Sequence, residues 1–166
     1  MERENLCSFG QRPFYQMFKS SAWIRYTTFR WITFAALLIT DRTAKLLAVL
    51  YLSETVVHGN ANFFSLSLYH NHGISFSMLK NFPSVSLAAS ILGIVVLGIV
   101  CLKSVSLRSS TGVIFLWAGA IGNLIDRLLY GYVIDWLYVG IHINLADIWL
   151  CAGCLMIFSR YVKGTT

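Results

Sequence analysis

Two long stretches of the chain carry no charged side chain. Residues 81–102 and residues 109–125 each lack Asp, Glu, Lys and Arg. A helix that spans a bilayer needs about 20 mostly apolar residues, so each stretch predicts a membrane-spanning helix. Two further apolar stretches, 31–52 and 148–162, contain or adjoin charged residues. The pattern predicts an all-α membrane protein with four transmembrane helices, in keeping with 57% hydrophobic and 12% charged residues.

The distribution of basic residues predicts how these helices are organised. We expect a basic tail of residues 1–26 and one membrane domain of residues 27–163. Its helices are expected at about 27–52, 84–102, 110–129 and 145–162, and its external loops at 53–83 and 130–144. The two loops contain Lys80 as their single Lys or Arg, whereas the other connections and both ends are basic. Basic residues favour the cytoplasmic side, so we expect both termini to be cytoplasmic. The net charge of +6 is explained by this topology, without nucleic-acid binding.

The first external loop has the alternating pattern of β-strands. Apolar residues alternate with serine over residues 64–68 and again over residues 74–78, on either side of Asn71-His72-Gly73. Period two around a turn predicts a β-hairpin with an apolar face and a serine face. Such a hairpin is either a platform for an extended peptide or a surface lid. The second loop is rich in Tyr and Trp, which predicts a position at the membrane interface.

Four aspartates lie in or at the edge of apolar segments, where an unpaired charge costs at least about 2.5 kcal/mol. They are Asp41, Asp126, Asp135 and Asp147. Asp41 and Lys45 are four residues apart, which predicts a structural ion pair on one helix face.

The segment 119–127 carries several polar residues at the end of a predicted helix. Asn123 and Asp126 are spaced to share a face, and Arg127 is expected to pair with a carboxylate or a lipid headgroup. Gly119 and Gly122 permit close approach of a second helix.

The environments of Asp135 and Asp147 differ. Asn144 and Asp147 are spaced as an N-cap and a first-turn carboxylate of the last helix, which by itself explains Asp147. A helix N-terminus favours the ionised carboxylate, whereas the apolar neighbours of Asp135 favour the protonated one. Two such carboxylates, brought together, share a proton and divide acid and base roles. The residues alone leave three classes open: a peptidase, a proton-coupled transporter or channel with Asp41, Asp126 and Asp147 as a relay, and a non-catalytic assembly factor.

Other chemistries have weaker support in the sequence. The four histidines are scattered through the predicted external loops, and no His-Glu-x-x-His pair, Gly-rich phosphate loop or Gly-x-Ser-x-Gly elbow is present. Cys151 and Cys154 form a C-x-x-C on a predicted helix, where we expect them to be packing residues rather than a redox pair or a metal site. We therefore expect no metal.

Four motifs, in order, resemble those of the bacterial lipoprotein signal peptidases, the signal peptidase II family. Asp41 to Lys45 resembles D-x-x-x-K, and Asn71 to Phe76 is similar to N-x-G-x-x-F. Gly119 to Trp136 resembles G-x-x-G-N-x-x-D-R followed by G-x-V-V-D-F. Asn144-Leu145-Ala146-Asp147 matches N-x-A-D. The likeness runs through nearly the whole chain after the basic tail.

The resemblance implies an aspartic endopeptidase of the bacterial inner membrane that cleaves diacylglyceryl-modified prolipoproteins before the lipidated cysteine. It implies Asp135 and Asp147 as the catalytic dyad, with a supporting shell of Asn71, Gly73, Asn123, Asp126, Arg127, Asn144 and Ala146. We expect an extracytoplasmic site, no cofactor, a monomer, and the lipidated substrate and membrane lipids as partners.

Two departures from the family pattern stand out. Eleven residues separate Asp135 from Asp147, fewer than expected, and Trp136 and Ile143 replace the usual Phe. We expect a reduced lid over the site and altered contacts with the lipid.

Overall fold

The structure is a computed structural model that describes residues 21–52, 64–73 and 83–164. It divides into two compact units, residues 1–33 and residues 34–166. Within the first unit, the described part is helical. The second unit contains every strand and all of the predicted site residues.

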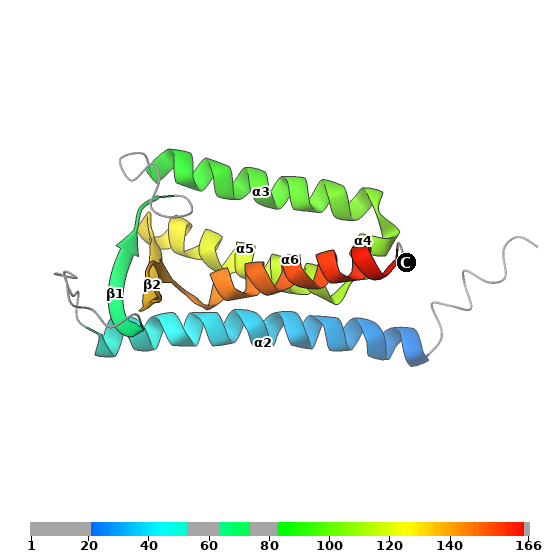
Figure 1. The fold of residues 1–166 in the computed structure, drawn as a ribbon, viewed down its shortest axis with the longest axis horizontal. Helices are drawn as coiled ribbons and strands as arrows, with labels where there is room; N and C mark the ends of the chain where they lie inside the picture. The colour runs from blue at the N-terminus through cyan, green and yellow to red at the C-terminus, as the bar shows by residue number, and fades with distance from the viewer. Residues whose placement is uncertain (1–20, 53–63, 74–82, 165–166) are drawn as a thin grey trace, which may run out of the picture. The chain divides into compact units, whose positions relative to one another are not determined.

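Helices account for most of the described chain (Figure 1): α2 (Ser21–Tyr51), α3 (Pro83–Lys103), α4 (Val105–Arg108), α5 (Thr111–Tyr130) and α6 (Leu145–Gly164). Three of them, α3, α5 and α6, are long and apolar enough to cross a membrane. Helix α2 is not among these three in the described chain, because Asp41, Arg42 and Lys45 lie close together in its apolar stretch. The structure therefore supports three of the four predicted spans.

Helix α5 is the most buried of the three apolar helices. Inside the structure, 44% of its apolar window is buried, against 11% for the windows of α3 and α6. Asn123 and Asp126 are among its buried residues. The helix ends at Gly131, whose φ of 78° is left-handed and whose N–H donates to Arg127 O at 3.1 Å. This glycine cap turns the chain directly into the next strand.

A small antiparallel sheet lies beside the end of α5 and the start of α6 (Figure 1). Its order is β1 (Ser65–Asn71), β2 (Val133–Tyr138) and β3 (His142–Ile143). The structure pairs β1 with β2, an interaction that the sequence analysis did not predict. The second predicted arm, residues 74–78, lies outside the described residues. Because α5 ends in a sharp turn, β2 returns alongside β1.

The predicted alternation of faces fails within β1. Leu66 pairs with Leu137 and Tyr69 with Asp135, so β1 advances three residues while β2 advances two. This bulge leaves Ser67 and Leu68 both buried and Leu66 exposed. An extra residue in one strand bends it and redirects its side chains, so there is no separate serine face.

Glycines on α5 bring α6 into close contact, as predicted. A Cβ on Gly119 would lie 2.4 Å from Ala146 O and 2.8 Å from Leu150 Cγ. A Cβ on Gly122 would lie 2.9 Å from Asp41 Oδ2. Side chains at these positions would push apart the segments that carry Asp147 and Asp41.

The predicted packing role of Cys151 and Cys154 is wrong. Both cysteines are exposed on α6. The buried residue between them is Gly153, where an added Cβ would lie 2.7 Å from Gly112 O. Glycine rather than cysteine allows the helices to approach here.

Gly119→Ala is expected to lower the thermal unfolding midpoint in detergent by several degrees, because the new methyl group overlaps the backbone of α6. Gly98→Ala is the matched control, since its Cβ would meet Trp117 at an ordinary 3.8 Å and alanine favours the helix. An equal midpoint for the Gly119 variant and the wild type would contradict this reading of the contact.

Candidate active site

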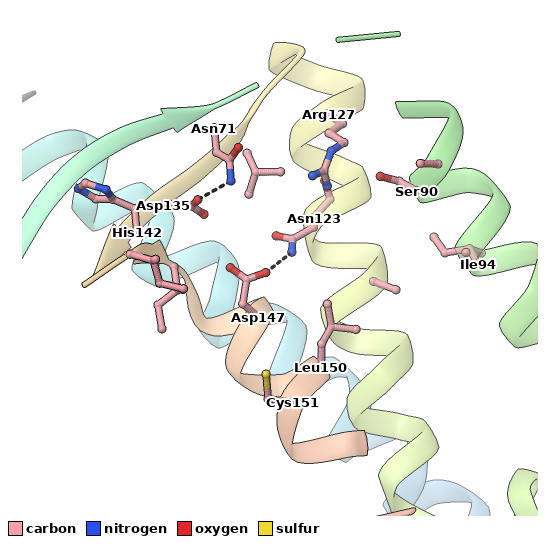
Figure 2. Close-up of a pocket in the computed structure, with 16 residues that line it drawn as sticks. Asn71, Ser90, Ile94, Asn123, Arg127, Asp135, His142, Asp147, Leu150 and Cys151 are labelled. Carbon is pink, nitrogen blue, oxygen red and sulfur yellow. Dashed lines mark hydrogen bonds between the residues drawn. The ribbon is translucent and has the colours of Figure 1, made fainter. Parts of the chain in front are cut away.

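Asp135 and Asp147 line one cavity of about 570 Å³ in the second unit (Figure 2). Asp135 comes from β2 and Asp147 from the first turn of α6. Further lining residues come from α3 and α5, including Ser90, Asn123 and Arg127. With Asn71 from β1 and His142 from β3, the cavity brings together residues from six elements around the two carboxylates.

Two side-chain amides hold the Asp135 carboxyl group. Asn71 Nδ2 donates to Oδ2 at 2.9 Å, and Asn144 Nδ2 donates to Oδ1 at 2.6 Å. Burial raises the pKa of Asp135 to about 7, and the negative charge of Asp147 acts in the same direction, whereas both amides lower the pKa. Close to neutral pH, Asp135 is therefore able to keep or release a proton.

The Asp147 carboxylate takes part in a reciprocal cap at the start of α6. Asn144 N donates to Asp147 Oδ2 at 3.1 Å, and Asp147 N donates to Asn144 Oδ1 at 3.1 Å. Asn123 Nδ2 donates to the other carboxylate oxygen at 2.9 Å. The predicted N-cap is confirmed, and it is a capping box in which each residue satisfies the other's backbone N–H.

Asn144 joins the two candidate catalytic residues, because its side chain bonds the Asp135 carboxyl group and its backbone N–H bonds the Asp147 carboxylate. Its Oδ1 accepts from the Asp147 backbone while its Nδ2 donates to Asp135, and the residue is fully buried. Capping α6 and building the site are therefore not alternatives, because the same residue does both. Any movement of Asn144 disturbs both carboxylates.

A second group of charges lies behind the cavity, around the buried Lys45. Lys45 Nζ lies 3.0 Å from Asp41 Oδ2, 2.8 Å from Asp126 Oδ2 and 3.1 Å from Asn123 Oδ1. The predicted Asp41 to Lys45 pair is confirmed. Asp126 also forms an ion pair with Arg42. We call Asp41, Arg42, Lys45 and Asp126 the charge cluster.

The charge cluster holds the backbone just before each candidate catalytic residue. Ile134 N, directly before Asp135, donates to Asp126 Oδ2 at 3.2 Å. Ala146 N, directly before Asp147, donates to Asp41 Oδ1 at 2.9 Å. Because Lys45 binds both acceptor carboxylates, one cation fixes both anchor points.

Among the described residues, Arg127 donates to neutral partners and forms no ion pair with a carboxylate. Its Nε donates to Ser86 Oγ at 2.7 Å and its Nη2 donates to Gly73 O at 3.1 Å. The Gly73 N–H in turn donates to Asn71 Oδ1 at 3.0 Å. Arg127 thus fixes the turn that orients Asn71 towards Asp135.

Comparisons with known proteins show the family to which the chain belongs. The profile of the family described as Signal peptidase (SPase) II matches residues 33–163. The chain belongs to the signal peptidase II family.

Individual relatives cover most of the chain. A lipoprotein signal peptidase of Buchnera aphidicola is 37% identical over an alignment of 138 residues that covers 76% of this chain and 78% of the relative. One of Fusobacterium nucleatum is 31% identical over an alignment of 143 residues that covers 78% of this chain and 83% of the relative. A solved bacterial membrane enzyme superimposes with a TM-score of 0.69 at 21% identity, covering 84% of this chain and 90% of that chain, which shows the fold. This signal peptidase II homologue is therefore an integral membrane protein and a peptidase.

The structure divides the shell expected from the signal peptidase II motifs into three parts. Asn71, Asn123 and Asn144 contact the two carboxylates directly. Gly73 and Arg127 hold the turn at Asn71. Asp126 is a member of the charge cluster, and the Ala146 backbone N–H donates to another member, Asp41.

Some residues around the site were not predicted. Arg42 and Ser86 bind members of the shell, and His142 lines the cavity with its Nε2 3.0 Å from Ser67 Oγ. Arg42 could have been found from the sequence, because it is a second charged residue directly after Asp41 in an apolar helix. Ser67 and Ser86 had no distinguishing pattern. Among the described residues, no group of three or more His, Cys, Asp or Glu side chains has metal-binding geometry.

Proposed function

We propose that this protein is a membrane-embedded aspartic endopeptidase that removes the signal peptide from diacylglyceryl-modified prolipoproteins, cleaving before the lipidated cysteine. The observation that carries the proposal is the convergence of Asp135 and Asp147 on one cavity, joined by Asn144. Membership of the signal peptidase II family and relatives named lipoprotein signal peptidases support the substrate class.

The surroundings of the two carboxylates suggest their roles. Asp147 accepts hydrogen bonds from a backbone N–H and the Asn123 amide at a helix N-terminus, which suits an ionised general base. Asp135, with a pKa of about 7, suits the protonated partner. Asp147 takes a proton from a water molecule while the water oxygen attacks the scissile carbonyl carbon, and Asp135 donates a proton to the carbonyl oxygen. When the intermediate collapses, the C–N bond breaks, Asp147 gives its proton to the leaving amine, and Asp135 takes a proton back from a hydroxyl group of the intermediate as the carbonyl group re-forms.

The proposed topology places the dyad at the extracytoplasmic face of the inner membrane. Helix α2 would be the fourth span, with its charged side chains satisfied inside the bundle by the charge cluster. Both termini would be cytoplasmic, since the loops at 53–83 and 130–144 are poor in Lys and Arg. A monomer suffices, because one chain supplies both carboxylates.

A transporter has less support from the geometry. Two of the three residues of the predicted relay, Asp41 and Asp126, are paired with Lys45 rather than lining the cavity. A buried carboxylate held by a cation is poorly suited to carry a mobile proton.

The proposal is tested by mass spectrometry of a purified lipidated precursor after incubation with the wild-type protein in detergent. The expected products are a free signal peptide and a lipoprotein that begins at the lipidated cysteine. An intact precursor in the presence of folded protein, together with proton flux into liposomes, would replace the peptidase with the transporter.

The pH dependence of kcat/KM for precursor cleavage is expected to have an alkaline limb near pH 7. The pKa of Asp135 is raised to about 7, so its proton is present below that pH and is lost as pH rises through it. Because the proposed mechanism needs that proton, the rate should fall about tenfold per pH unit beyond the limb. Single-turnover cleavage between pH 5 and pH 9 measures this, with thermal unfolding at each pH as the control. A rate that rises steadily through pH 8 would reverse the assignment.

A further inference from the structure

The bulge in β1 directs Ser67 to a place that a regular strand would not reach. Ser67 is 3% exposed, although its neighbour Leu68 is buried as well. Bulges beside active sites commonly re-aim one side chain. The Ser67 hydroxyl group forms a hydrogen bond with the His142 ring.

His142 is held on three sides. Its Nε2 lies 3.0 Å from Ser67 Oγ. Its ring stacks on Tyr69 at a centroid distance of 4.6 Å and an interplanar angle of 17°, and it lies tilted against Tyr138 at 4.9 Å. His142 is on β3, whereas Ser67 and Tyr69 are on β1, so these contacts cross the middle strand, β2, which carries Asp135.

The strand that His142 secures has little else to hold it. β3 consists of His142 and Ile143, which pair with Tyr138 and Leu137 of β2. A two-residue edge strand is weakly held by its backbone alone. Asn144 follows directly and bonds both carboxylates. The position of β3 therefore contributes to the position of Asn144.

We propose that Ser67 and His142 are positioning residues for the cleavage reaction, which hold β3 to β1 and thereby keep Asn144 in contact with Asp135 and Asp147. The inference rests on the proposed function of these two carboxylates. This contact also explains how the short connection between Asp135 and Asp147 is held in place. A side-chain contact across the sheet replaces the backbone hydrogen bonds that a longer paired strand would supply.

The charge state of the ring fits this role. Burial lowers the pKa of His142, so the imidazole is neutral at neutral pH and shares one hydrogen bond with the Ser67 hydroxyl group. Among the described residues, the titratable side chains that contact the ring are Tyr69 on β1 and Tyr138 on β2. Asp135 on β2 and Asp147 on α6 line the same cavity as His142.

Three variants separate the hydrogen bond from the ring packing. Ser67→Ala removes the hydroxyl group, and His142→Phe keeps a ring for Tyr69 but removes Nε2. His142→Gln keeps an amide near the position of Nε2. Ser65→Ala, on the same strand but half-exposed, is the matched control. Each protein is compared with the wild type for kcat, KM and the pH profile of lipidated-precursor cleavage, and for thermal unfolding in detergent.

We expect Ser67→Ala and His142→Phe to lower kcat about tenfold with KM within about twofold, and His142→Gln to stay within about threefold. The double variant should lose no more than either single variant. Because the Asn144 amide lowers the pKa of Asp135, a loosened Asn144 should also move the alkaline limb to higher pH. A loss of folded protein alone would lower the rate equally at every pH.

Folded Ser67→Ala and His142→Phe variants with wild-type kcat and an unmoved alkaline limb would overturn the inference. So would a lowered kcat without a shifted limb, or an active His142→Phe beside an impaired His142→Gln. These outcomes leave the proposed function intact as long as the wild type cleaves the precursor. A wild-type protein that leaves the precursor uncut would contradict the proposed function, and the inference with it.

Discussion

Asp135→Asn and Asp147→Asn are each expected to lower the rate of precursor cleavage by at least about 10³-fold. Asparagine keeps the shape of the side chain but neither stores nor releases the proton. Both residues line the same cavity and contact Asn144, so each loss should affect one shared step. The measurement is single-turnover cleavage of a lipidated precursor, with the products quantified by mass spectrometry.

The control for these variants is Cys154→Ser, an exposed change on the helix that carries Asp147. It should cleave at the wild-type rate. All variants are first compared with the wild type by thermal unfolding in detergent. Substantial cleavage by a folded Asp135→Asn or Asp147→Asn protein would remove that residue from the dyad.

Lys45→Met is expected to destabilise the folded protein by about 3–5 kcal/mol, because it leaves Arg42 as the one cation of the charge cluster beside two buried carboxylates. Lys45 is 1% exposed, and Asp41 and Asp126 are 0% exposed. The same change should release the backbone anchors before Asp135 and Asp147. Chemical unfolding in detergent and the yield of folded protein measure the effect.

A compensated variant tests the cause of that loss. Lys45→Met combined with Asp41→Asn removes one negative charge with the cation and keeps the ion pair between Asp126 and Arg42, so part of the lost stability should return. Lys103→Met, an exposed change at the end of α3, should leave the unfolding midpoint unchanged. A Lys45→Met protein as stable as the wild type would show that the charge cluster does not hold the fold together.

The apolar helices were predictable because the bilayer demands long uncharged stretches, and such stretches are visible in a single sequence. Helices α3 and α5 coincide with the two charge-free segments. The partner of β1 was not predictable in the same way. Period two shows that a strand forms, but it does not show which distant strand completes the ladder, and a bulge interrupts the period.

The candidate site was predictable where one residue type carries an unusual cost. Four aspartates in apolar segments required an explanation, and the structure pairs or hydrogen-bonds all four. Spacing alone did not predict which of the four aspartates pair with cations and which line the cavity. Asn123 and Asp126 share a helix face as expected, and both reach Lys45 on α2, but only the tertiary fold determines that Arg127 turns away towards Ser86.

The acidic residues of the charge cluster and those of the cavity differ in the groups that they bind. Asp41 and Asp126 are neutralised by Lys45 and Arg42 and accept backbone N–H groups. Asp135 and Asp147 are held by amides, which bind a carboxyl group without adding a positive charge beside it. Amide donors leave both groups free to exchange a proton.

The claim that both carboxylates act on one group is tested most directly by binding rather than by rate. The probe is a lipidated peptide in which a secondary alcohol replaces the scissile carbonyl, so that its hydroxyl group mimics the attacked carbon's oxygen. We predict that Asp135→Asn and Asp147→Asn each weaken its Kd at least about 100-fold, and that the double variant is no weaker than either. If one single variant binds the alcohol as tightly as the wild type does, the two carboxylates do not meet at the scissile bond.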